Sequence, residues 1–144
     1  MNVARMKAPL DSALMSSFVA RVDELNDLAD RSPGFVWRLK SDAGGAALSL
    51  PYEDDRLIVN FSVWESVETL KDYAYRSVHA DAYRRRHEWF EHFDGAYSVL
   101  WWVPAGYIPT IEEAKDRLAH LQTHGPSPYA FGFKSVHQPD GIEV

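Results

Sequence analysis

The chain has 144 residues, a length typical of one domain with one hydrophobic core. Its net charge of −6 and its pI near 5.4 argue against nucleic acid as a partner, because phosphate binding needs a basic surface. There is no cysteine, which excludes disulfides, thiolate catalysis and cysteine-ligated metals. No apolar run reaches the ~20 residues of a membrane span, and residues 1–12 lack the apolar stretch of a signal peptide. We therefore expect a cytoplasmic protein without membrane contact.

The first forty residues predict a strand, a helix and a second strand. Residues 2–7 alternate as a short strand. Apolar residues at helical spacing then run to about Asp30, with Asp11 or Ser12 as the cap of this helix. The sequence RSPG at 31–34 ends the helix, and residues 35–40 alternate as a strand.

The strands at 35–40 and 56–64 carry the side chains of most interest. On the first strand, alternation places Phe35, Trp37 and Leu39 on one face and Arg38 on the other. On the second strand, one face is wholly apolar. The opposite face contains Ile58, Asn60, Ser62 and Trp64. A buried asparagine needs several hydrogen-bond partners, so this face either lines a polar pocket or is less buried than the pattern indicates.

The second half predicts a long helix, a strand and a C-terminal helix. The helix covers 65–93, with a kink near Ser77, and the strand covers 96–104. The last helix covers 109–125, with Thr110 and Glu113 as a capping box. The order β-α-β-β-α-β plus a C-terminal helix indicates a single α+β domain, residues 1–144, of the ferredoxin-like kind.

The predicted sheet has apolar residues on both faces, so one face needs a cover besides the helices. A second copy of the chain is the simplest cover. We therefore expect a homodimer that associates through the sheet faces.

Residues 75–93, YRSVHADAYRRRHEWFEHF, raise the question of which charges face water. On a continuous helix the apolar stripe consists of Tyr75, Val78, Ala82, Trp89, Phe90 and Phe93. His79 and Arg86 fall inside this stripe, Tyr83 lies at its edge, and Arg84 is opposite it. An inward arginine keeps its charge and needs an acceptor. His79 and Arg86 are either core residues satisfied by local hydrogen bonds or members of a ligand pocket.

Asn60, Trp64, His79 and Arg86 together would make such a pocket, with an aromatic wall, an amide, a base and a fixed cation. Further candidates for contact with a substrate are Trp37, Ser62, Tyr83, Phe90 and Trp102. The Trp101–Trp102 pair is expected to place one ring on each side of the fourth strand. His120 and His124 have a metal-binding spacing, but no third ligand is evident.

The segments VNFSVWESVETLKDYAYRSVHADAYRRRHEWF, YSVLWWVPAGYIPTIEEAKDRLAHL and GPSPYAF resemble a bacterial family of unknown function in the dimeric α+β barrel superfamily. The superfamily includes monooxygenases that oxidise aromatic polyketides without metal or flavin, haem-degrading enzymes, and small isomerases and cyclases. The resemblance implies a dimer and a pocket between sheet and helices. It matches Asn60 and Trp64 to the strand residues of the monooxygenases. It also makes His79 the candidate histidine of the haem-degrading members, although its interval from Trp64 departs from theirs.

We therefore expect a monooxygenase-like enzyme that acts on a small aromatic or polyketide-like substrate, with an anionic group as one option, and that needs no metal or flavin. In this mechanism Asn60 and Trp64 stabilise an oxyanion, His79 takes a proton and Arg86 holds negative charge. The same groups also suit a proton-transfer isomerisation or cyclisation. The alternatives are a haem-binding or haem-degrading protein with His79 as axial ligand, and a small-ligand-binding dimer without activity.

Overall fold

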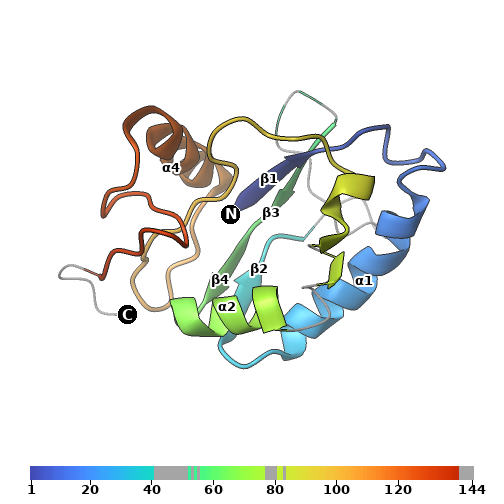
Figure 1. The fold of residues 1–144 in the computed structure, drawn as a ribbon. Coiled ribbons are helices and arrows are strands. Elements are labelled where there is room, and N and C mark those ends of the chain that lie inside the picture. Colours follow the sequence, from blue (N-terminus) through green and yellow to red (C-terminus); the bar gives the residue numbers. More distant parts are fainter. Residues whose placement is uncertain (41–51, 53, 55, 77–80, 83, 140–144) are drawn as a thin grey trace. The chain divides into compact units, whose positions relative to one another are not determined.

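The computed structural model describes residues 1–40, 52, 54, 56–76, 81–82 and 84–139, and its helices and small antiparallel sheets make it an α+β protein (Figure 1). The chain forms two compact units. Unit 1 comprises Met1–Val3 and Phe93–Val144, and unit 2 comprises Ala4–His92. Among the described residues, no helix has the length and apolarity needed to span a membrane.

The predicted strand at 56–64 is two strands that pair with different partners. β3 (Leu57–Asn60) pairs with β1 (Asn2–Arg5), and β4 (Ser62–Trp64) pairs with β2 (Phe35–Arg38). Phe61 lies between β3 and β4 and is 3% exposed. The alternation of apolar residues across 56–64 predicted one uninterrupted strand, because the pattern does not reveal a change of partner.

β2 and β4 are antiparallel, and their register shifts between Phe35 and Trp37. Phe35 pairs with Trp64, whereas Trp37 pairs with Val63. The extra residue in β2 is a β-bulge, which moves the side chains that follow it to the other face. The prediction that Phe35 and Trp37 share a face is therefore wrong.

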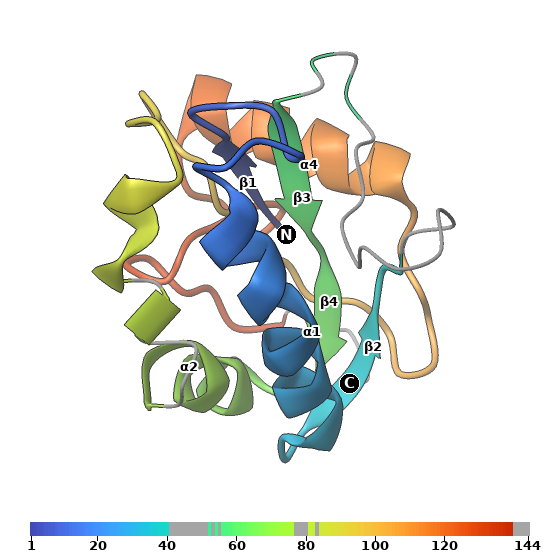
Figure 2. The same cartoon turned by 90° about the vertical axis from the view of Figure 1, so that its right-hand side faces the viewer.

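Two helices of unit 2 pack on these strands (Figure 2). α1 (Ser16–Arg31) contacts β2, and α2 (Val67–Arg76) contacts β4. α1 begins later than predicted, with Met15 rather than Asp11 or Ser12 at its N-cap and without a side-chain cap. Met15 is completely buried, so packing fixes where this helix starts.

The predicted helix at 65–93 is shorter and interrupted. α2 ends at Arg76, a 3₁₀ turn, η1, covers Arg86–Glu88, and Phe90 forms a β-bridge with Met6. A 3₁₀ turn has ~3.0 residues per turn instead of ~3.6, so the residues beyond it no longer follow the predicted wheel. The kink expected near Ser77 lies outside the described residues.

The core of unit 2 joins its strands to α1. Its buried members are Met6, Met15, Leu25, Ile58, Ala82 and Trp89. Phe18 and Phe90 pack against them, with ring centroids 5.0 Å apart in an edge-to-face arrangement. These contacts attach Ala82, Trp89 and Phe90 to α1 and β3.

Unit 1 contains the predicted C-terminal helix, α4 (Ile111–His124). The hydroxyl of Thr110 accepts a hydrogen bond from the backbone N–H of Glu113, and Gly125 ends the helix with φ of 78°. These two features confirm the predicted start and stop of α4.

The strand predicted at 96–104 forms only isolated bridges, Asn2 with Ser98 and Leu100 with Phe131. Two different partners share this segment, so neither ladder becomes long. Phe131 is 1% exposed, so this part of the tail packs against its own unit.

Candidate functional site

Rings of Phe35, Trp64 and Tyr73 meet on the face of β4 that α2 covers. The Trp64 and Tyr73 rings are stacked, with centroids 5.1 Å apart and planes at 25°. The Phe35 ring meets Trp64 edge-on at 5.5 Å. The indole N–H of Trp64 donates to Ser62 Oγ at 2.9 Å, as expected for two residues on the same face of a strand. We name these four residues, together with Arg38, the Trp64 cluster.

Tyr73 links the cluster to α1. Its hydroxyl donates to the backbone carbonyl of Leu25 at 3.0 Å, and the residue is 9% exposed. Burial raises the pKa of Tyr73 to about 12. The ring is therefore neutral and fixed at physiological pH, and it supports the indole from behind.

Arg38 supplies the cationic group of the cluster. It pairs with Ser62 across the strands, and only 13% of its side chain is exposed. Asp30 of α1 accepts hydrogen bonds from Arg38 Nε at 2.8 Å and from Nη2 at 3.2 Å. The hydrogen bond from Arg38 holds the pKa of Asp30 below its usual value. This ion pair fixes the orientation of the guanidinium.

Asn26 lies one helical turn before Asp30, on the same side of α1. Its amide nitrogen is buried, and within the described part of the chain it has no hydrogen-bond partner. A buried amide without a partner is costly in a folded protein. A ligand oxygen or a water that reached the Asn26 amide would therefore be stabilised there.

Of the site residues predicted from the sequence, Trp64 and Ser62 lie together in the Trp64 cluster. Asn60 and Trp37 do not belong to it. Asn60 is exposed at the end of β3, whereas Ser62 and Trp64 of the same predicted face are half-buried. The Trp37 ring packs edge-on against Phe61 at 5.4 Å instead of against Trp64. The β-bulge in β2 is the physical reason for this separation.

The arginine run at 84–86 is graded in exposure, and Arg84 is exposed as predicted. The Arg84 side chain is 71% exposed and that of Arg85 is 40% exposed. Arg86 is half-buried at the start of η1 rather than fully inward. Tyr75, predicted in the buried stripe, is 48% exposed.

The remaining candidates divide into three cases. Phe90 is half-buried in the core of unit 2, where its ring contacts those of Phe18 and Trp89. His79 and Tyr83 lie outside the described residues. Trp102 belongs to unit 1, where its indole N–H donates to the carbonyl of His137 at 2.7 Å.

Sequence reasoning missed Arg38, Tyr73 and Asp30. Arg38 was assigned to the face opposite Phe35 and Trp37, and the bulge brings it to the face of Ser62 and Trp64. The only signal in the sequence was an arginine in the middle of an otherwise apolar strand. The described residues contain no group of three or more His, Cys, Asp and Glu side chains that could hold a metal ion. The cluster thus offers flat apolar surface, an indole and a guanidinium, which suit recognition of an aromatic compound with an electronegative group.

Comparison with known proteins places the chain in a family without assigned activity. Residues 1–144 match the family model described as "Domain of unknown function (DUF3291)", and the chain belongs to this family. No curated protein and no solved structure matches the chain. The family membership confirms the expectation of a family of unknown function and leaves the activity open.

Proposed function

We propose that the protein is an enzyme that oxygenates a small aromatic or polyketide-like substrate without metal or flavin, with the Trp64 cluster as its site. The observation that supports this most is the fixed position of the Trp64 indole. Tyr73 stacks on it, Phe35 meets its edge, and Ser62 accepts its N–H. A wall that is already rigid loses little conformational entropy when a flat ligand binds against it.

The polar groups of the proposed site orient the substrate and its charge. Asp30 accepts from two nitrogens of Arg38, and we assign the third guanidinium nitrogen to a phenolate or carbonyl oxygen of the substrate. The exposed amide of Asn60 is the proposed donor to the oxyanion that develops during reaction. His79 is the proposed base that removes a proton from the substrate. Arg86 is a second candidate for holding the negative charge.

A polyphenolic substrate supplies its own electrons to dioxygen. A ring methylene becomes a carbonyl, one oxygen atom enters that carbonyl, and the other leaves as water. The protein's part is to hold the deprotonated ring and to stabilise its charge, so the reaction needs groups of the kind found in the Trp64 cluster.

We also propose the ferredoxin-like sheet and a homodimer formed through it. The strand neighbours within each unit support this arrangement. Residues 1–3 pair with 97–99, β1 pairs with β3, and β4, one residue after β3, pairs with β2. A ferredoxin-like sheet requires these three neighbour relations. Native mass spectrometry of the purified protein tests the dimer, and a monomer across micromolar concentrations would contradict it.

The proposed activity is tested by oxygen uptake with a panel of anthrones and naphthalenediols. An absorbance spectrum of the purified protein comes first, because a haem Soret band would overturn the cofactor-free reaction. We expect uptake with at least one compound and a kcat about 100-fold lower for Asn60→Ala, the loss typical of one oxyanion donor.

Trp64→Phe keeps a stacked ring and loses the bond to Ser62, so we expect kcat/KM to fall about tenfold, the equivalent of ~1.4 kcal/mol. Trp101→Phe is the matched control, since it makes the same substitution in unit 1. Equal activity of Trp64→Phe and Trp101→Phe would remove Trp64 from the site. Binding of a panel compound without oxygen uptake would support the alternative of a ligand-binding protein and contradict the enzyme.

A further inference from the structure

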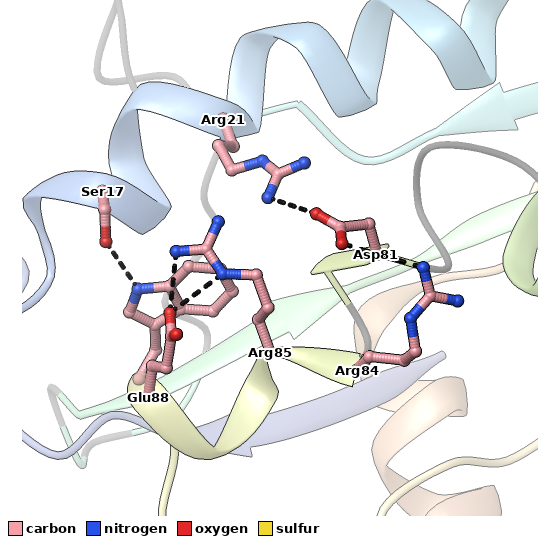
Figure 3. Close-up of polar contacts among 7 residues, drawn as sticks. Ser17, Arg21, Asp81, Arg84, Arg85 and Glu88 are labelled. Atoms are coloured by element: carbon pink, nitrogen blue, oxygen red, sulfur yellow. Dashed lines mark hydrogen bonds and ion pairs between the residues drawn. The ribbon is translucent and has the colours of Figure 1, made fainter.

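Five charged residues of unit 2, one of them on α1, form ion pairs close to one another (Figure 3). We call them the arginine cluster. Its members are Arg21, Asp81, Arg84, Arg85 and Glu88. Arg21 Nη1 donates to Asp81 Oδ2 at 2.9 Å, and Arg85 donates to Glu88 Oε2 through Nη2 at 2.8 Å and Nε at 3.1 Å. The hydrogen bond from Arg21 holds the pKa of Asp81 below its usual value.

The cluster has more positive than negative charge. It contains three guanidiniums and two carboxylates, on a chain whose net charge is −6. Of the three arginines, Arg84 makes the weakest contacts with the carboxylates. Its Nη2 is 3.7 Å from Asp81 Oδ1, and among the described residues it makes no hydrogen bond. With 71% of the side chain exposed, its donors are open to a ligand.

Arg85 is held in one orientation by the core below it. Its guanidinium carbon lies 5.1 Å from the centre of the Trp89 ring, which is a cation–π contact. Trp89 is 1% exposed, and its indole N–H donates to Ser17 Oγ at 2.8 Å. A guanidinium that is fixed before binding loses less entropy when it binds a planar or tetrahedral oxyanion.

We propose that Arg21, Arg84 and Arg85 form a binding site for a phosphoryl dianion. A free monocarboxylate carries the same charge and the same two acceptor oxygens as the side chains of Asp81 and Glu88, which already bind these arginines. It would therefore gain little by replacing them. The three guanidiniums exceed the two carboxylates by one positive charge, and a phosphoryl dianion offers three acceptor oxygens to the guanidinium donors that the carboxylates do not occupy. This site shares no residue with the Trp64 cluster, so its test is independent of the proposed oxygenation.

The test is isothermal titration calorimetry with inorganic phosphate and with phenyl phosphate, at pH 8 and at ionic strength held constant with sodium chloride. Arg84→Gln removes the exposed cation without breaking a hydrogen bond to a described residue, and we expect it to weaken binding about tenfold. Arg31→Gln is the matched control. It removes an exposed arginine from the end of α1, the helix that carries Arg21, and we expect less than a twofold change.

Asp81→Asn is expected to tighten phosphate binding, the opposite of the effect of Arg84→Gln. The reason is that it removes a carboxylate that competes with phosphate for Arg21 and Arg84. Should Asp81→Asn fail to fold, Arg84→Gln still decides the question. Tighter binding of phenyl phosphate than of inorganic phosphate assigns the site to a phosphate monoester, and equal binding assigns it to free phosphate. No binding of either probe, or equal affinity in Arg84→Gln and wild type, would overturn the proposal.

Discussion

Gly34 is the residue at which a single added carbon atom is expected to disturb unit 2 most. Its φ is +82°, which an L side chain rarely adopts. A Cβ at this position would lie 2.5 Å from Oγ1 of Thr69 and 2.6 Å from both its Cβ and Cγ2. The carbonyl of Gly34 also accepts from the N–H of Glu65 at 2.7 Å. The turn that leads into β2 therefore sits directly against the first turn of α2.

The cost of Gly34→Ala has two parts. The left-handed backbone costs about 1–2 kcal/mol for a residue with a Cβ. Inserting the methyl group against Thr69 adds about 1–3 kcal/mol, the range for overpacking. We expect a loss of about 2–5 kcal/mol from the free energy of unfolding, a large fraction of the ~5–15 kcal/mol typical of a native protein.

Gly106→Ala separates the two parts. Gly106 has the same φ of +82°, and nothing lies within 4 Å of the Cβ that it would gain. It should therefore lose only the backbone part, about 1–2 kcal/mol. The difference between the two variants measures the contact with Thr69.

Urea unfolding followed by far-UV circular dichroism gives both free energies. Equal losses in Gly34→Ala and Gly106→Ala would refute the close approach of Thr69. A loss below about 0.5 kcal/mol in Gly34→Ala, the range of neutral surface substitutions, would refute both parts.

Three further predictions concern titration, packing and capping. Tyr73 has its pKa raised by burial to about 12, so its contribution to stability is complete below pH 10 and is lost as the pH rises through about 12. Unfolding measured from pH 9 to 12 should show a loss of about 2 kcal/mol that Tyr73→Phe abolishes. Trp89→Phe removes the hydrogen bond to Ser17 and should cost about 1–3 kcal/mol in urea unfolding, whereas Trp101→Phe serves as its comparison. Thr110→Ala removes the cap of α4 and should lower the thermal midpoint, in line with a loss of about 1 kcal/mol, while the exposed Thr123→Ala should change it little.

Elements that local chemistry specifies could be predicted from the amino-acid sequence. α4 was predicted because the cap at Thr110, the apolar spacing and the stop at Gly125 all lie within the helix or beside it. The end of α1 followed in the same way from RSPG, and the α+β class followed from the order of helical and alternating segments. Ser62 and Trp64 could be paired because two residues apart on a strand share a face.

Features that depend on a partner strand or on packing could not be predicted from the sequence. A β-bulge depends on the pairing with the neighbouring strand. The sequence of β2 alone therefore could not predict that Trp37 lies apart from Trp64, or that Arg38 lies on the face of Ser62 and Trp64. The predicted long helix does not continue past η1, so Phe90, which the wheel placed in the helical apolar stripe, forms a β-bridge with Met6 instead. The exposure of Asn60 depends on where β3 ends and β4 begins, and a change of pairing partner sets this point. Periodicity records which residues prefer burial, whereas the register between strands decides which of them meet.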